Sequence, residues 1–297
     1  MSLIQTLIIG SDSFIAKKFI QQNPSMDFKG IARQKTDLSD ELVLQDFSKV
    51  NPNIFQNIDA VINFAAIVHQ PKVNDKVLYE KINHQLPVQL AKLAKSSGVK
   101  HFIQLSTIAV YGNRTSINLN SPDNPENDYG TSKLKADIEL LQMQDNYFNV
   151  TIIRPSMVYG GGKAPGNMLK LINVTKKNIP LPFKNIENLR QFCNIHLLVD
   201  ALNEIVKHKK AGTFLIADKK GISTFELLQK ISIITEKNLW FFEPPAIFLK
   251  LLKKFKPSLY DKLYGSLIID VKHTFDSLNL LETKYSIDDA LAEMIKS

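Results

Sequence analysis

The chain contains one cysteine, Cys193, in 297 residues, so no disulfide bond can form within it. Because structural disulfides belong to oxidising compartments, we expect a cytoplasmic protein in which Cys193 is a buried thiol. No apolar run reaches the roughly 18 residues of a membrane-spanning helix, so no integral membrane segment is expected. The apolar residues 1–10 lack a basic stretch and a small-residue cleavage site, which predicts a buried strand and not a signal peptide.

Acidic residues are the minority among the charges. The 37 lysines and arginines against 29 aspartates and glutamates give a net charge of +8 and a pI near 9.3. The excess is lysine scattered along the chain, with no basic block between aromatic residues, so we expect no nucleic-acid partner. A positive field also suits a substrate that carries a diphosphate. No metal site is expected.

Short apolar runs alternate with helical patterns in the first half of the chain. Such runs, separated by amphipathic segments like residues 86–95, predict an α/β fold with a Rossmann-like doubly wound parallel sheet. That architecture binds its ligand at the carboxyl ends of the strands. The expected strands are residues 7–10, 29–33, 60–64, 101–105 and 150–154.

The pattern changes after about residue 160, where a loop rich in glycine and proline begins. We expect a dinucleotide-binding domain at 1–165, to which a strand and helix near 195–217 return. The remainder, 166–297, would form a smaller C-terminal substrate-binding region. Within it, residues 246–255 predict a basic amphipathic helix. Such a helix could dock on a membrane, but we favour a packed surface helix with its lysines outward.

Tyr129 and Lys133 form a Tyr-x-x-x-Lys pair, which places both side chains on one helical face, one turn apart. A phenol with a pKa near 10 is a poor acid–base catalyst at neutral pH. A lysine ammonium one turn away favours the phenolate, so we predict that Lys133 lowers the pKa of Tyr129. Upstream, residues 105–112 form a strand that ends in hydroxyl groups and offers Thr107 as a third member.

These motifs resemble those of the extended short-chain dehydrogenase/reductase family, which includes nucleotide-sugar epimerases, dehydratases and ketoreductases. The resemblance implies that Tyr129 moves the proton at the sugar O4 and that Thr107 hydrogen-bonds the same oxygen. It also implies that Lys133 holds the nicotinamide ribose, while the nicotinamide carries the hydride. Thr107 stands where the family usually has serine, and the hydroxyl is retained.

The first loop, residues 10–16, stands where the family has Gly-x-x-Gly-x-x-Gly around the cofactor's pyrophosphate. Only Gly10 is a glycine; Ser13 and Ala16 hold the other two places, and a positive φ at Ser13 would be strained. Alone, the loop fits an ordinary strand–turn–helix. Neighbouring matches support a cofactor site: Phe14 and Ile15, Ala65 and Ala66 at the end of an Asp-x-Val-x-x-x-Ala-Ala strand, and Pro155 and Ser156 in an Arg-Pro-x-x-x-Tyr-Gly strand end.

The end of the second strand bears on the choice of cofactor. NAD binding uses a carboxylate there, whereas NADP binding uses a cation. The chain has Arg33, followed by Lys35, and no acid before Asp37. We predict NADP(H), with NAD as the alternative if Arg33 is only a solvated strand end. Asp37 and Leu38 resemble the family's Asp-Leu contact with adenine.

Three residues are expected to reach the substrate. Asn167 and Arg190 match family residues that contact the diphosphate, and a planar guanidinium suits phosphate. His69 lies in an Ala-Ala-x-Val-His segment. With residues 179–183, 222–228 and 264–270, this segment resembles bacterial UDP-4-keto-6-deoxy-N-acetylhexosamine 4-reductases.

The sequence therefore predicts NADP(H)-dependent reduction of the 4-keto group of a UDP-linked amino deoxy sugar, for surface polysaccharide synthesis. The alternative is a UDP-hexose 4-epimerase that keeps NAD bound, built from the same three catalytic residues. A third possibility, a cofactor-sensing regulator without activity, follows from the degraded glycine loop. The sugar, its C4 stereochemistry and a homodimer are left open.

Overall fold

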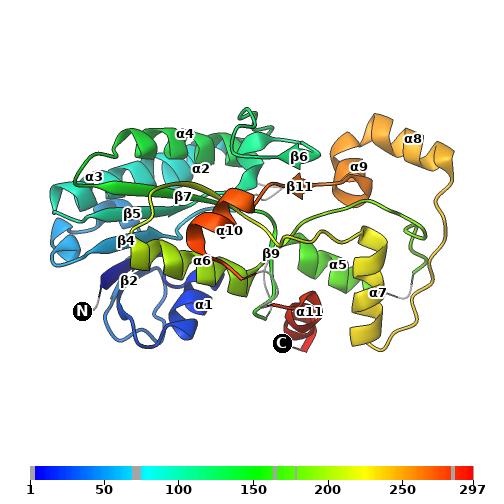
Figure 1. The fold of residues 1–297 in the computed structure, drawn as a ribbon, viewed down its shortest axis with the longest axis horizontal. Helices are drawn as coiled ribbons and strands as arrows, with labels where there is room; N and C mark the ends of the chain where they lie inside the picture. Colours follow the sequence, from blue (N-terminus) through cyan, green and yellow to red (C-terminus); the bar gives the residue numbers. More distant parts are fainter. Residues whose placement is uncertain (1–3, 69–74, 163–165, 178, 282–284, 297) are drawn as a thin grey trace. The chain divides into compact units, whose positions relative to one another are not determined.

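A seven-stranded sheet has the order β10-β7-β5-β4-β1-β2-β3 (Figure 1). The pairings from β7 to β3 are parallel, and the strand order reverses beside β1, so the expected doubly wound α/β fold is confirmed. The computed structural model describes residues 4–68, 75–162, 166–177, 179–281 and 285–296. The strands are β1 Gln5–Ile9, β2 Asp27–Ala32, β3 Glu41–Val43, β4 Ala60–Asn63, β5 His101–Leu105, β7 Asn149–Pro155 and β10 Gly212–Ile216.

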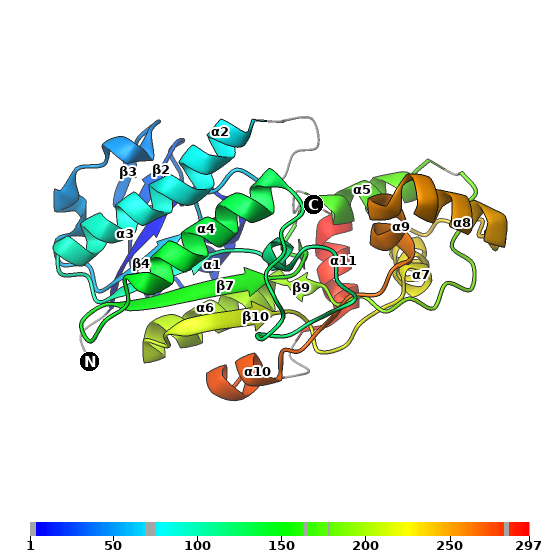
Figure 2. The same ribbon diagram turned by 90° about the horizontal axis from the view of Figure 1, so that it is seen from above.

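The central strands form because they are apolar along their whole length. Leu7, Ile8 and Ile9 of β1 are completely buried, as strands covered on both faces require. Helices α3 and α4 lie on one face of the sheet, and α1 and α6 lie on the other (Figures 1 and 2). The bounds are α1 Phe14–Gln22, α2 Lys76–Tyr79, α3 Leu86–Ser96, α4 Asp128–Gln142 and α6 Ile195–His208, with a π-helical turn Glu80–Gln85 between α2 and α3.

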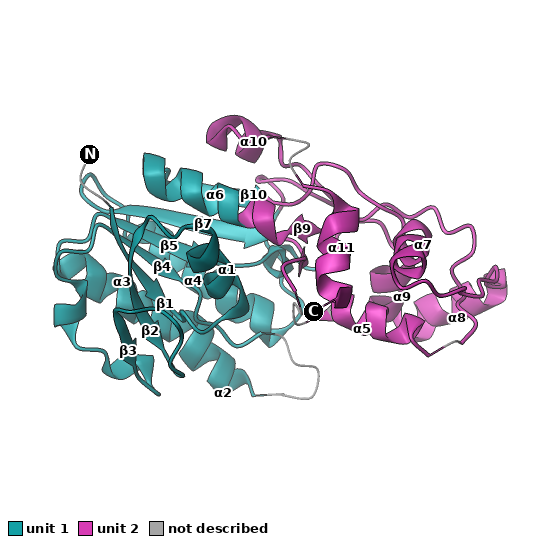
Figure 3. Cartoon of the chain, turned by 90° about the horizontal axis from the view of Figure 1, so that it is seen from below, with its two compact units in different colours: residues 1–112, 122–155, 199–215 teal, residues 113–121, 156–198, 216–297 magenta. Residues whose placement is uncertain are grey.

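The chain divides into two compact units (Figure 3). Unit 1 comprises residues 1–112, 122–155 and 199–215, and unit 2 comprises residues 113–121, 156–198 and 216–297. The second segment of unit 1 thus ends at residue 155, whereas the sequence suggested a boundary at 165. Residues 113–121 also belong to unit 2, because β6 Ser116–Ile117 pairs with β11 Ile268–Ile269.

Unit 2 is mainly helical around a small apolar core formed by Leu181, Phe183, Leu228 and Tyr264. Cys193 also lies in unit 2 and is fully buried, as expected of a structural thiol. Burial raises the pKa of this thiol. No helix within the described ranges is long and apolar enough to cross a membrane. The remaining elements are β8 Val158–Tyr159, β9 Cys193–Asn194, α5 Asn167–Thr175, α7 Thr224–Ile234, α8 Ala246–Phe255, α9 Pro257–Tyr264, α10 Lys272–Leu278 and α11 Ile287–Lys296.

Candidate active site

The three residues predicted to be catalytic all lie in unit 1, on α4 and on the loop after β5. Asn127 caps α4 by accepting the Gly130 N–H at 2.8 Å, so Tyr129 stands in the first helical turn. A hydrogen bond joins the side chains of Tyr129 and Thr107. Lys133 is 1% exposed, and its Nζ donates to the carbonyl of Leu105 at 2.6 Å. The structure therefore brings the tyrosine and the threonine hydroxyl together, with the lysine on the same helix.

Gly130, directly after Tyr129, allows this close approach. A Cβ at Gly130 would lie 2.8 Å from the carbonyl oxygen of Ala109, nearer than real Cβ contacts allow. The first turn of α4 can therefore lie against the turn after Thr107 only because this position has no side chain.

The predicted lowering of the Tyr129 pKa is wrong for this arrangement. Burial raises the pKa of Tyr129 to about 12, the charge of Asp137 raises it further, and the hydrogen bond from Thr107 lowers it only in part. Burial also lowers the pKa of Lys133 to about 8. Because the ammonium of Lys133 is turned to the Leu105 carbonyl, spacing along the helix did not decide the pKa of the phenol; burial did.

A buried ionic network, which the sequence analysis missed, lies next to the proposed catalytic residues on α4 and the loop after β5. Asp137, one turn beyond Lys133, accepts from Ser106 Oγ at 2.8 Å and from Arg154 Nε at 3.0 Å. Arg154 also donates to the Tyr111 hydroxyl at 2.8 Å. Burial raises the pKa of Asp137, and the charge of Arg154 partly offsets this effect. The i, i+4 spacing from Lys133 to Asp137 was a usable signal for it.

Unit 1 also contains a pocket of about 350 Å³ at the carboxyl ends of β1 and β4, here called the β1 pocket. Its lining includes Gly10, Ser13, Arg33, Ala65 and Ala66, all expected to contact the cofactor. Gly10 has a φ of +78°, and a Cβ there would lie 2.9 Å from the Ala65 nitrogen, so the two loops can approach only at a glycine.

Serine at position 13 causes no strain. Its φ of −72° is ordinary, and Ser13 is the N-cap of α1, where its Oγ accepts from the Ala16 N–H at 3.3 Å. Ala16 is fully buried, so its methyl group packs in the place of a glycine. The first turn of α1 therefore presents backbone N–H groups beside the β1 pocket, an arrangement that fits a pyrophosphate.

Four further residues expected at the cofactor do not line the β1 pocket. Phe14 and Ile15 form the first turn of α1. Asp37 and Leu38 lie in the loop after β2, where the Leu38 side chain is directed toward Gly30. In their place the lining contains Asp46 and Phe47, which come shortly after the strand β3 that the sequence analysis missed.

Glu41 of β3 was also missed, and it holds two loops of this region together. Its buried carboxylate accepts from Ser11 Oγ, from the Thr36 N–H and from Thr36 Oγ1, each at 2.7 Å. Burial raises the pKa of Glu41, but the hydrogen bonds from Thr36 and Ser11 outweigh it and bring the pKa below its usual value. Glu41 thus fixes the loop after β1 to the loop after β2.

Unit 2 contains a pocket of about 370 Å³ between α5, α7 and α9, here called the α5 pocket. Arg190 lines it together with Lys170 and Lys262. The Arg190 Nη1 donates to the carbonyls of Asp261 and Gly265 at 2.9 and 2.8 Å, which ties it to the end of α9. Asn167 is the first residue of α5, but its side chain lies outside the described structure, as does the whole of His69.

Pro155 ends β7, and Ser156 follows it at the start of a unit 2 segment. The Ser156 N–H donates to the Ile216 carbonyl at 2.9 Å. Its hydroxyl is buried and has no hydrogen-bond partner among the residues described.

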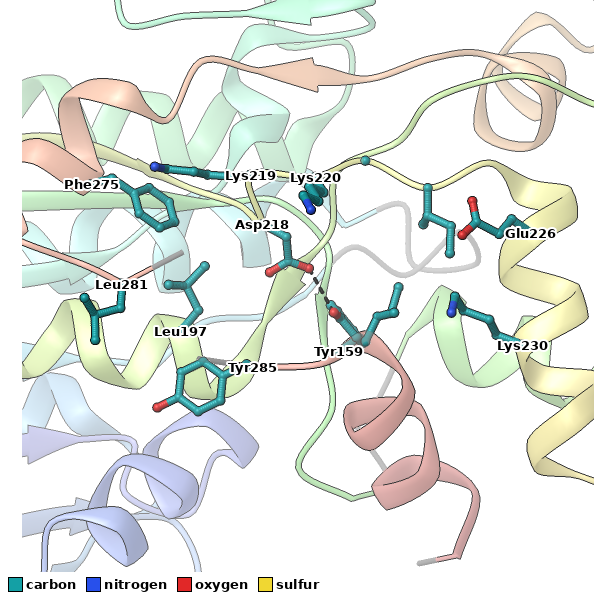
Figure 4. Close-up of a pocket in the computed structure, with 13 residues that line it drawn as sticks. Tyr159, Leu197, Asp218, Lys219, Lys220, Glu226, Lys230, Phe275, Leu281 and Tyr285 are labelled. Carbon is teal, nitrogen blue, oxygen red and sulfur yellow. Dashed lines mark hydrogen bonds between the residues drawn. The ribbon is translucent and has the colours of Figure 1, made fainter. Parts of the chain in front are cut away.

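A second pocket of unit 2, bounded by Asp218, Lys219, Lys220 and Lys230, contains none of the predicted site residues (Figure 4). The Tyr159 hydroxyl donates to the Asp218 carboxylate at 2.9 Å, as the dashed line in Figure 4 shows. Burial raises the pKa of Asp218 to about 6.

Comparisons with known proteins identify the family of this chain. A family model described as the NAD dependent epimerase/dehydratase family matches residues 7–217. A UDP-glucose 4-epimerase from Vibrio cholerae is 36% identical over 236 residues, which cover 75% of this chain and 72% of that protein. An N-acetyl-alpha-D-glucosaminyl-diphospho-ditrans,octacis-undecaprenol 4-epimerase from Escherichia coli O157:H7 is 24% identical over 245 residues, covering 78% and 73%.

Solved structures share the fold at lower identity. MoeE5 in complex with UDP-glucose and NAD matches with a TM-score of 0.79 at 19% identity, covering 98% of this chain and 97% of that chain. The UDP-glucuronic acid 4-epimerase from Bacillus cereus in complex with NAD matches with a TM-score of 0.79 at 20% identity, with the same coverage. With the family model spanning most of the chain, this protein belongs to the NAD-dependent epimerase/dehydratase family and is an enzyme of the epimerase type.

Proposed function

We propose that this enzyme catalyses oxidation and reduction at C4 of a UDP-linked sugar, with 4-epimerisation as its overall reaction. The observation that carries the proposal is the grouping of Tyr129, Thr107 and the buried Lys133 in unit 1. The 36% identity to a UDP-glucose 4-epimerase supports the same reaction. We place the activity in the cytoplasm, where the single cysteine stays reduced.

Each catalytic side chain has a role that follows from its environment. Tyr129 moves the proton at the sugar O4, and Thr107, already hydrogen-bonded to it, binds the same oxygen. Burial raises the pKa of Tyr129 to about 12 in this arrangement, so the protonated phenol suits the reduction half-reaction, in which it gives its proton to O4. In the oxidation half-reaction the same side chain must be deprotonated so that it can accept the proton from O4. Lys133 holds the ribose of the cofactor and supplies a nearby positive charge.

The residues that line the β1 pocket suit the adenine and pyrophosphate part of a nicotinamide dinucleotide. Gly10 and the Ser13-capped start of α1 would hold the pyrophosphate, and Ala65 and Ala66 would border the dinucleotide. We assign the adenine contact to Asp46 and Phe47, in place of Asp37 and Leu38. When bound, the nicotinamide accepts and returns the hydride.

The UDP group is assigned to the α5 pocket. Its volume of about 370 Å³ lies in the range of small-ligand sites, and three cations line it. Arg190 uses its Nη1 to bind the end of α9, and its guanidinium has two further nitrogens. A guanidinium pairs well with a diphosphate. The name of the second relative gives an undecaprenol-linked diphosphate as its substrate. Such a diphosphate could bind the same three cations, but it has no nucleoside to contact the apolar residues that line the α5 pocket.

The 4-ketoreductase with NADP(H) is the second candidate, and Arg33 favours it. The side chain of Arg33 is exposed. Of the described residues that line the β1 pocket, Arg33 is the one with a positive charge. A cation at the end of β2 suits the 2′-phosphate of NADP, and a reductase must exchange its cofactor in every turnover.

One experiment separates these reactions. Purified enzyme is incubated with UDP-glucose and UDP-N-acetylglucosamine without added cofactor, and separately with a UDP-4-keto-6-deoxy sugar plus NADPH. An epimerase produces the C4 epimer in the first mixture without net change in cofactor absorbance. A reductase consumes one NADPH for each product in the second. If neither mixture changes, while UDP and NAD(H) also fail to stabilise the protein, the proposed function is wrong.

A further inference from the structure

The outer face of α8 in unit 2 is apolar and lacks a partner among the described residues of this chain. Leu249 and Leu252 pack against the apolar core of unit 2, but no residue of the helix is fully buried. The other large apolar residues are exposed: Ile247 64%, Phe248 43%, Leu251 48% and Phe255 71%. The helix lies at the rim of unit 2, beside α9 (Figures 1 and 3).

Helical geometry shows that these four residues share one surface. At about 100° per residue, Ile247, Phe248, Leu251 and Phe255 fall within an arc of roughly 100°. The two packed leucines continue this arc on its inner side. The apolar face of α8 is therefore wider than packing within unit 2 requires. The helix packs on unit 2 and has its lysines outward, as expected, but large apolar residues are exposed beside the lysines.

The charge of α8 has one sign. Residues 246–256 contain Lys250, Lys253, Lys254 and Lys256 and no acidic residue. The Nζ of Lys254 lies 5.7 Å from the centre of the Phe255 ring, so the lysines border the exposed apolar surface directly. Contiguous exposed apolar area with such a border marks an interaction surface.

We propose that α8 docks this protein on the surface of an anionic lipid bilayer. An amphipathic helix with lysines beside leucine and phenylalanine lies in the plane of the interface, with its apolar face among the headgroups and its lysines toward anionic lipid. Lysine is depleted in protein–protein interfaces, which argues against a protein partner here. Ten residues of helix span only about 15 Å, so α8 lies on the membrane and does not cross it.

The test measures binding of the full-length protein to vesicles of phosphatidylglycerol and phosphatidylcholine, compared with phosphatidylcholine alone. We expect cosedimentation with the anionic vesicles and weaker binding at high salt. Position 248 also serves as a reporter, because the chain has one tryptophan. In a Trp240→Phe background, Phe248→Trp should shift its emission to the blue when vesicles are added.

Two sets of variants assign the binding to α8. Leu251→Gln/Phe255→Gln removes two exposed apolar side chains and should weaken vesicle binding by about a hundredfold or more. Lys250→Gln/Lys253→Gln/Lys254→Gln should weaken it by about tenfold or more. Lys92→Gln/Lys100→Gln/Lys207→Gln removes the same charge from exposed positions of unit 1 and should leave binding nearly unchanged.

All these side chains are exposed, so the variants should fold, which circular dichroism verifies. The proposal is overturned if the protein does not bind anionic vesicles or if the emission of the Phe248→Trp variant does not move on binding. It is also overturned if the unit 1 lysine control weakens binding as much as the α8 variant. A dimer in sedimentation velocity that Leu251→Gln/Phe255→Gln dissociates, without vesicle binding, would instead identify α8 as an interface between copies.

Discussion

Arg154 Nε lies 3.0 Å from Asp137 Oδ2, in a buried ion pair that joins the end of β7 to α4. Asp137 stands one turn beyond Lys133 and also accepts from Ser106, the residue before Thr107. The pair therefore connects the strand, loop and helix on which the proposed catalytic groups stand. Since Asp137 acts on those groups through its position and charge, we regard it as a positioning residue.

The first prediction concerns pH. Burial lowers the pKa of Lys133 to about 8, so kcat/KM should fall as pH rises through about 8 and the ammonium is lost. The charge of Asp137 raises the pKa of Lys133, so Asp137→Asn should move this alkaline limb to lower pH and should also destabilise the fold by about 3–5 kcal/mol. Glu139→Gln, a partly exposed carboxylate of the same helix that contacts His84, is the control. An Asp137→Asn profile that overlays the wild type would refute the positioning role.

The second prediction concerns proton transfer. Tyr129→Phe should lower kcat by about 10²–10⁴ and leave cofactor affinity nearly intact. Lys133→Ala should impair both, because it is assigned to the ribose as well. Tyr147→Phe, at a position that is 79% exposed, should change neither. Near-normal turnover of Tyr129→Phe in a stopped-flow assay would exclude this residue as the acid.

The third prediction concerns cofactor preference. If Arg33 pairs with a 2′-phosphate, the contact is worth about 1.5–3 kcal/mol, and calorimetry should show NADPH binding more tightly than NADH. Arg33→Asp should reverse the order. Lys100→Asp, an exposed lysine of unit 1 that does not line the β1 pocket, is the control. Equal or tighter binding of NADH by the wild type would favour the NAD-retaining epimerase.

The fourth prediction concerns Glu41. Its folded pKa lies below the usual 4.5, so its carboxylate stabilises the fold above that pH and the effect is lost as pH falls through the folded pKa. Glu41→Gln should therefore lower the free energy of unfolding by about 1–3 kcal/mol at pH 7. The difference should shrink below pH 4.5. Urea titrations at both pH values measure it, with the surface change Glu126→Gln as control, and a difference independent of pH would contradict the prediction.

The fifth prediction concerns the α5 pocket. UDP should raise the melting temperature by binding the native state. Arg190→Lys keeps a charge but loses the planar fork, so the UDP concentration needed for the same shift should rise about tenfold or more. Protection by NAD(H) should persist, and Lys184→Gln, an exposed control, should behave as the wild type. No shift with UDP, where NAD(H) gives one, would remove the UDP-sugar assignment.

The sequence determined the local structure well, because local structure follows from local pattern. The continuous apolar runs predicted the central strands, and the expected strand 101–105 and helix 246–255 have those bounds in the structure. Tyr-x-x-x-Lys placed Tyr129 and Lys133 on one helical face because helical spacing is fixed. Gly10 was the expected turn at the end of β1, since only glycine tolerates that approach to Ala65.

Tertiary structure decided what depends on burial and on partners distant in the sequence. The pKa of Tyr129 is set by desolvation and by Asp137, not by the lysine one turn away. Asp46, not Asp37, lines the β1 pocket. Between these two residues lies the strand β3, whose three residues are too few to show a strand pattern in the sequence. The exposure of the apolar face of α8 could be seen only in the tertiary structure. The amphipathic spacing in the sequence is the same whether other residues cover this face or not.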